Sequence, residues 1–163
     1  MKSILLIRHA KSSWDSPTMK DFDRPLNERG LKDAPMMAQR MLDRKVKLDA
    51  IISSTAKRAF TTATFFAKAH QQKESDIKRI DKLYHAMPPV FEEVVAEISP
   101  AHNTVAIFSH NPGITEFANL LGVARIDNMP TCGILGVHFL CDDWQQAMQS
   151  EKRFWLFDYP KNI

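Results

Sequence analysis

Several features that would assign a specialised class of protein are scarce or missing from these 163 residues. Only two cysteines occur, Cys132 and Cys141, and neither lies in a CxxC pair or at metal-ligand spacing. We therefore expect free thiols in a reducing compartment. The apolar run at residues 4–7 is too short for the core of a signal peptide, and no segment is long enough to span a membrane. The sequence thus predicts a cytoplasmic protein with no membrane partner.

The charge of the chain is nearly balanced, with 22 Lys and Arg against 19 Asp and Glu and a formal net charge of +3. The basic residues form no stripe, and the densest cluster, at residues 40–47, is expected at a solvated helix end, so we expect no nucleic-acid partner. The slight positive excess favours anionic ligands. Because no repeat, low-complexity tract or linker is visible, residues 1–163 are expected to form a single domain.

Short apolar runs alternate with segments of helical periodicity along the chain. We expect strands at residues 4–7, 50–52, 77–84 and 104–108, and two late strands at 134–140 and 154–159 that can run antiparallel. Helices are expected at 27–44, 55–69, 90–98 and 111–121, with Pro35 kinking or restarting the first and Asn111 capping the last. This alternation predicts an α/β fold, a three-layer α/β/α sandwich with a mostly parallel sheet.

Cationic residues follow the predicted strands. The first strand ends in Arg8 and His9, and the second runs toward Arg58. The third ends near His85, and a later strand is followed by His110. In an open parallel sheet, ligands bind outside the carboxyl ends of the strands, where these side chains would gather. Because clustered cations cost free energy unless an anion joins them, we expect a site for inorganic phosphate, sulfate or a phosphoryl group.

At these residues the sequence resembles the histidine phosphatase superfamily, which has the phosphoglycerate-mutase-like fold, and in particular its short phosphohistidine phosphatase branch. The resemblance covers nearly the whole chain and is carried by LIRHAKS, DFDRPLNERG, ISSTAKRAFTT and FSHNPGI. Ala10 stands where the family has glycine, so a left-handed backbone there would be strained. The glutamate that larger members use as a proton donor has no evident counterpart, because the corresponding region reads KLYHAMPP.

The resemblance implies that neutral His9 attacks phosphorus and that water then hydrolyses the phosphorylated histidine. Arg8, Arg58 and a protonated His110 are expected to stabilise the developing charge. One ring nitrogen of His9 should donate a hydrogen bond that fixes the tautomer, to a partner that the sequence does not identify. We expect no cofactor and no metal, because the arginines would repel a cation and no carboxylate or cysteine completes a ligand set.

Weaker expectations concern the residues around this catalytic set. Four residues are expected to contact substrate: Arg24, Ser54, His85 and Asn111. The alternatives for a proton donor are Asp21, Asp23 and His85. The loop residues Lys11 and Ser12 can also reach phosphate.

The missing glutamate bears on the substrate. An ester leaves as a strongly basic alkoxide and gains from a positioned acid, whereas a phosphohistidine leaves as an imidazole whose conjugate acid has a pKa of about 6.5. Only the loop at residues 11–25 remains to cover the site, so we expect an open pocket. We therefore predict a phosphatase that acts on protein phosphohistidine. The alternatives are a small-molecule phosphomonoesterase or mutase on the same scaffold, and a phosphoprotein-binding module without turnover.

Overall fold

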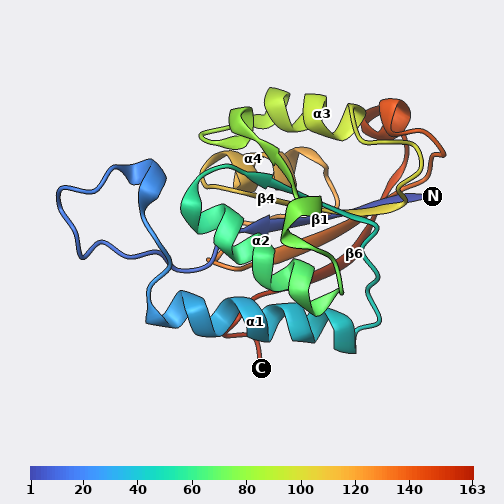
Figure 1. Ribbon diagram of the computed structural model, residues 1–163. Helices are drawn as coiled ribbons and strands as arrows, with labels where there is room; N and C mark the ends of the chain where they lie inside the picture. Colours follow the sequence, from blue (N-terminus) through green and yellow to red (C-terminus); the bar gives the residue numbers. More distant parts are fainter.

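The computed structural model describes residues 1–163 and is built around one six-stranded sheet (Figure 1). The strands are β1 (Lys2–Arg8), β2 (Ala50–Ser54), β3 (Lys78–Ile80), β4 (Thr104–Ser109), β5 (Ile134–Phe139) and β6 (Lys152–Asp158). Their order across the sheet is β3-β2-β4-β1-β5-β6, in which the first four strands are parallel and β5 is antiparallel to both of its neighbours. The predicted, mostly parallel sheet with an antiparallel late strand is confirmed.

Helices cover both faces of this sheet (Figure 1). The α-helices are α1 (Glu28–Asp43), α2 (Lys57–Ala69), α3 (Pro88–Ala96) and α4 (Gly113–Leu120). Short 3₁₀ turns are η1 (Asp21–Asp23), η2 (Glu74–Asp76), η3 (Asp81–Leu83) and η4 (Trp144–Gln149). The helices α1 and α2 pack on one face, and α3 and α4 on the other. The predicted three-layer α/β/α sandwich is confirmed.

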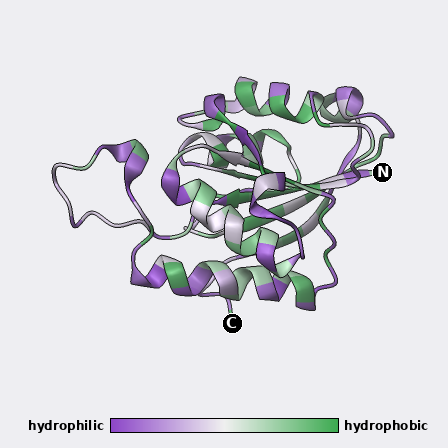
Figure 2. Cartoon of the chain, viewed as in Figure 1, coloured by the Kyte–Doolittle hydropathy of each residue, from purple (hydrophilic) through white to green (hydrophobic).

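Strand β1 lies inside the sheet and is buried on both of its faces. Ile4 and Leu6 pack in the apolar cluster under α3 and α4, whereas Leu5 and Ile7 pack in the cluster under α1 and α2. Figure 2 shows the central strands coloured mostly as hydrophobic, whereas hydrophobic and hydrophilic residues alternate along the helices. The continuous apolar run that predicted this strand therefore reflects burial from two sides.

The first turn of α1 is fixed by a side-chain cap and a close backbone contact. The side chain of Asn27 accepts a hydrogen bond from the amide of Gly30 at 2.9 Å. A Cβ at Gly30 would overlap the Lys11 carbonyl, so only glycine lets the helix lie against the segment that follows β1. Of the two effects expected of Pro35, a kink or a restart, the restart does not occur, because α1 continues through Pro35, which lies on the exposed side where water can satisfy the carbonyl of Leu31.

Two predicted boundaries are wrong. The strand expected at residues 77–84 spans only Lys78–Ile80, because this edge strand pairs with β2 alone and η3 follows at once. Asn111 does not cap α4, which begins at Gly113 after Pro112. Instead, the Asn111 amide donates to Asn128 and to a backbone carbonyl of the loop that follows α4.

None of the helices in the structure is both long and apolar enough to cross a membrane.

Candidate active site

Two histidines meet where β1 and β4 end. Arg8 pairs with Ser109 in the register of these neighbouring parallel strands, so the residues that follow, His9 and His110, lie side by side. The backbone amide of His9 donates to the Ser109 carbonyl at 3.2 Å, and the two imidazole ring centroids are 5.2 Å apart. The chain leaves β1 toward α1 and leaves β4 toward α4, on opposite faces of the sheet. Such a switch in topology opens a crevice at the strand ends.

The side chain of His9 is 6% exposed and is held through both of its ring nitrogens. Its Nδ1 lies 2.8 Å from the carbonyl oxygen of Ala10, an acceptor only, so Nδ1 carries the proton. The unprotonated Nε2 accepts a hydrogen bond from Nε of Arg58 at 3.3 Å. The partner that fixes the tautomer is therefore the backbone of the next residue. Ala10 is not among the residues with a positive φ, so the strain that was expected there does not arise.

The surroundings of His9 keep its imidazole neutral. Burial lowers the pKa of His9 to about 3, against the opposing effect of the Ala10 carbonyl. The charges of Arg58, Arg8 and Arg24 act in the same direction as burial. A neutral imidazole with an unprotonated Nε2 has the form that a nucleophile requires, once its lone pair turns from Arg58 to phosphorus.

His110 is also neutral in the free protein. Burial, followed by the charges of His9 and Arg58, lowers the pKa of His110 to about 2; the protonated form was expected with a phosphoryl group bound, whose negative charge would raise this pKa. Its Nε2 lies 2.8 Å from Oγ of Ser54, whereas its buried Nδ1 has no hydrogen-bond partner. Because the Ser54 hydroxyl can donate to Nε2, Nδ1 can carry a proton and offer it to an anion.

The side chain of Arg58 is held by the turn η1. Its two terminal nitrogens donate to the backbone carbonyl of Asp21 at 2.7 Å and to the carboxylate of Asp21 at 3.0 Å. The same carboxylate accepts from Nε of Arg24 at 3.0 Å and from the hydroxyl of Tyr84 at 2.5 Å. Burial raises the pKa of Asp21, but Tyr84 and the two arginines outweigh it and hold the pKa well below its usual range. Asp21 is therefore ionised and poorly suited to donate a proton.

A cavity of about 260 Å³ opens in front of these side chains. Of the predicted catalytic set, all four line it: Arg8, His9, Arg58 and His110. Of the residues expected to contact substrate or phosphate, it is lined by Arg24, His85, Asn111, Lys11 and Ser12. Ser54 is a correction: it is fully buried beneath His110 and does not line the cavity. Asp23 lies outside the lining as well.

The sequence did not single out two further residues of the cavity, Trp14 and Thr131. The Trp14 ring lies over the guanidinium of Arg24, with the central carbon 3.6 Å from the ring centroid, yet 72% of the residue is exposed. The exposed His85, which was expected to contact substrate, has a φ of 60°, and its ring lies tilted against that of Tyr84 with centroids 3.9 Å apart. The only sign of this part of the cavity wall in the sequence is the position of Trp14, a large side chain shortly after His9.

Residues 4–85 match the family model of the histidine phosphatase superfamily, branch 1. The chain belongs to this superfamily. It is therefore a phosphatase, a hydrolase with the phosphoglycerate-mutase-like fold that the sequence predicted. The matched range contains Arg8, His9, Arg24 and Arg58, and ends before His110.

Of three similar proteins, two extend over nearly the whole of this histidine phosphatase, and the other over about half of it. An uncharacterized chloroplast protein of Arabidopsis thaliana is 30% identical over 154 residues, which cover 90% of this chain and 70% of that protein. Phosphoserine phosphatase 1 of Hydrogenobacter thermophilus is 35% identical over 89 residues, 53% of this chain and 41% of its own length. The solved structure assigned as a candidate phosphohistidine phosphatase, SixA of Agrobacterium tumefaciens, is 28% identical, covers 98% of this chain and 99% of its own, and superposes with a TM-score of 0.81.

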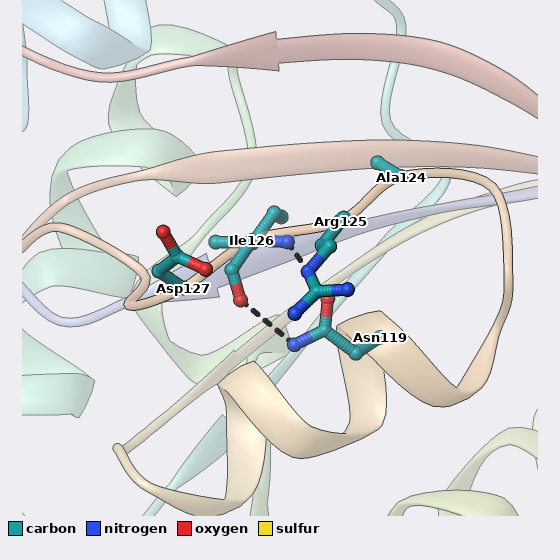
Figure 3. A pocket seen from close by; sticks show the side chains of 5 residues that line it. All are labelled: Asn119, Ala124, Arg125, Ile126 and Asp127. Atoms are coloured by element: carbon teal, nitrogen blue, oxygen red, sulfur yellow. Dashed lines mark hydrogen bonds between the residues drawn. The ribbon is translucent and has the colours of Figure 1, made fainter.

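A larger hollow of about 530 Å³ in this phosphatase lies where α4 meets the loop that follows it (Figure 3). The Asn119 amide donates to the Ile126 carbonyl and accepts from the Ile126 amide, each at 2.8 Å. Both polar ends of that side chain are thus occupied in holding the loop. The two charged residues that line this hollow, Arg125 and Asp127, have opposite signs, so the hollow has no excess of positive charge to hold an anion.

Proposed function

We propose that this phosphatase removes the phosphoryl group from phosphohistidine on another protein, through a phosphorylated His9. The observation that carries the proposal is the state of the His9 ring: Nδ1 donates to a backbone carbonyl, and Nε2 is left unprotonated beside Arg58. A nucleophile is thus placed among the cations that would hold the phosphoryl oxygens.

The reaction balances in two displacements. In the first, Nε2 of His9 attacks the phosphorus of a phosphohistidine whose other ring nitrogen carries a proton; the P–N bond of the substrate breaks, and its electron pair stays on the departing neutral imidazole. In the second, water attacks the phosphorus on His9, the new P–N bond breaks with its electron pair returning to Nε2, and the protons of the water leave with inorganic phosphate, which restores neutral His9 with its proton on Nδ1. Nε of Arg58 and the unpartnered Nδ1 of His110 can each donate to a phosphoryl oxygen during both steps.

The cavity has little to offer a leaving group that needs a strong proton donor. Asp21 is the only carboxyl group that lines it, and the surrounding hydrogen bonds keep its pKa below the usual range. An alkoxide would have to leave without an acid, whereas an imidazole can leave with little help. The lining therefore supports a P–N substrate over a phosphate ester.

The rim of the cavity supports a protein substrate. The segment at residues 11–25 projects from the body of the molecule as an arm (Figure 1). It exposes three large apolar side chains, Trp14 at 72%, Met19 at 41% and Phe22 at 38%. Exposed apolar groups beside a charged cavity are typical of surfaces that bind another protein.

The test compares kcat/KM for a phosphohistidine-bearing protein with kcat/KM for small phosphate esters. We expect the phosphohistidine protein to be the better substrate by at least about 100-fold, the lower range of what a general acid contributes. The exchange of Met19 for alanine, on the same segment but outside the lining of the cavity, should raise KM for the protein and leave small substrates unchanged. Faster ester turnover would overturn the proposal.

A second candidate is a small-molecule phosphomonoesterase. The observation that favours it is the similarity to phosphoserine phosphatase 1, which extends over 53% of this chain. The same comparison of substrates separates the two functions, because this candidate requires efficient turnover of a free phosphate ester.

A further inference from the structure

A second cavity opens beside the catalytic one and is here called the flanking cavity. Its volume is about 330 Å³. Three residues, Arg8, Lys11 and Thr131, line both cavities. The remaining wall comes from Arg29 in the first turn of α1, from Pro130, and from residues 159–161 after β6. Segments far apart in the sequence therefore form one wall next to the catalytic residues.

The flanking cavity carries four positive charges and no negative one among the residues that line it: Arg8, Lys11, Arg29 and Lys161. The ammonium groups of Lys11 and Lys161 make no ion pair and no hydrogen bond within the protein. Arg29 has one partner, Asp33, which its Nε contacts at 3.3 Å, so its two terminal nitrogens stay free. Asp33 therefore offsets the charge of Arg29 alone, and the excess of positive charge in the lining favours an anionic ligand.

Arg8 lines both cavities, and several of its N–H donors have no partner within the protein. One terminal nitrogen donates to the carbonyl of Met129 at 2.8 Å, and its buried Nε has no partner. Since the guanidinium has five N–H donors, it can contact an anion on each side. Two hydroxyl groups, on Thr131 and Tyr159, also line the flanking cavity and can donate to oxygen.

We propose that the flanking cavity binds a second anionic group of the substrate, a carboxylate or a phosphate, next to the phosphoryl group held at His9. In the main form of this inference, which rests on the proposed function, the second anionic group is an acidic side chain near the phosphohistidine of the substrate protein. A small molecule with two anionic groups is the other source of the same chemistry. The flanking cavity then acts on affinity, so it changes KM and leaves kcat unaltered.

The main experiment uses two phosphohistidine peptides that differ only in their flanking residues, Asp and Glu in one and Asn and Gln in the other. For the native enzyme at low salt we expect KM to be about five-fold to ten-fold lower for the acidic peptide, as two charge contacts at a partly exposed site would give. This preference should shrink in 0.5 M salt, because ions screen exposed charges.

The variant is the double exchange Arg29→Gln with Lys161→Gln. Both side chains are exposed, so the fold should be retained. We expect KM for the acidic peptide to rise about five-fold and kcat and the KM of the neutral peptide to stay within two-fold. The matched control, Lys32→Gln with Lys47→Gln, removes two exposed charges outside both cavities and should retain the preference.

Equal KM values for the two peptides with the native enzyme would overturn the inference, as would equal effects of the double variant and the control. If neither peptide is hydrolysed, the proposed function fails, and competitive inhibition of ester turnover then tests the flanking cavity. An alkyl bisphosphate that inhibits the native enzyme about five-fold better than an alkyl monophosphate, but not the double variant, supports the flanking cavity. Equal inhibition by the two compounds overturns it.

Discussion

The two neutral histidines make the response to acid a sharp test of the site. At pH 5 an imidazole with the ordinary pKa of 6.5 is about 97% protonated. The pKa of His9 is lowered to about 3 by burial and by the neighbouring arginines, so at pH 5 about 1% of it should be protonated. The pKa of His110 is lowered further, to about 2, again mainly by burial.

These pKa values set the sign of the stability change. Between pH 3 and 6.5 the unfolded chain binds protons at these positions and the folded protein does not, so the free energy of unfolding falls as the pH falls. From pH 7 to pH 5 each histidine should cost about 2 kcal/mol, and the pair about 4 kcal/mol. His70 and His138, whose pKa values are also lowered by burial, add to the loss with the same sign.

The assay is urea unfolding at pH 7, 6 and 5 for the native protein and for His110→Gln, with ring NMR of labelled histidine. The contributions of the other histidines cancel in the comparison. We expect the variant to lose about 2 kcal/mol less than the native protein between pH 7 and 5, and the His9 ring to keep its Nδ1–H form throughout. The reasoning would be refuted if the native protein and His110→Gln lost the same free energy of unfolding between pH 7 and 5, or if the His9 ring titrated near pH 6.5.

Three further substitutions test single contacts. Asp21→Asn removes a negative charge that occupies Arg58, so the inhibition constant of inorganic phosphate should fall about ten-fold, and an unchanged or higher constant contradicts this. Ser54→Ala removes the hydroxyl 2.8 Å from Nε2 of His110, which should lower kcat about ten-fold with little change in KM, as steady-state kinetics can show. Gly113→Ala would drive a Cβ into a neighbouring backbone carbonyl and should cost at least about 2 kcal/mol in urea unfolding.

The architecture and much of the site could be predicted because both follow from local patterns. A strand buried on two faces reads as a continuous apolar run, and polar residues at its end lie at the ligand-binding edge of the sheet. Arg8 and His9 could be placed in this way from β1 alone. The pairing of His9 with His110 required only that β1 and β4 be neighbours, which parallel strands in such a sheet commonly are.

The rest depends on contacts that no local pattern carries. Asp21 reaches Arg58 across 37 residues, so its role as a fixed carboxylate rather than a proton donor could not be anticipated. Ser54 lies just after an apolar run, like a residue that faces a ligand, but the packing of His110 covers it. The flanking cavity needs the strand order that brings the chain after β6 beside α1, which the sequence did not specify.

The most direct test of the central claim is to stop turnover of a labelled phosphohistidine protein within milliseconds in alkaline detergent and to map the phosphate on the enzyme. The account predicts one acid-labile, alkali-stable phosphoryl group on His9, and none in His9→Ala. An unlabelled native enzyme under conditions of full turnover, or a label that remains in His9→Ala, would contradict it.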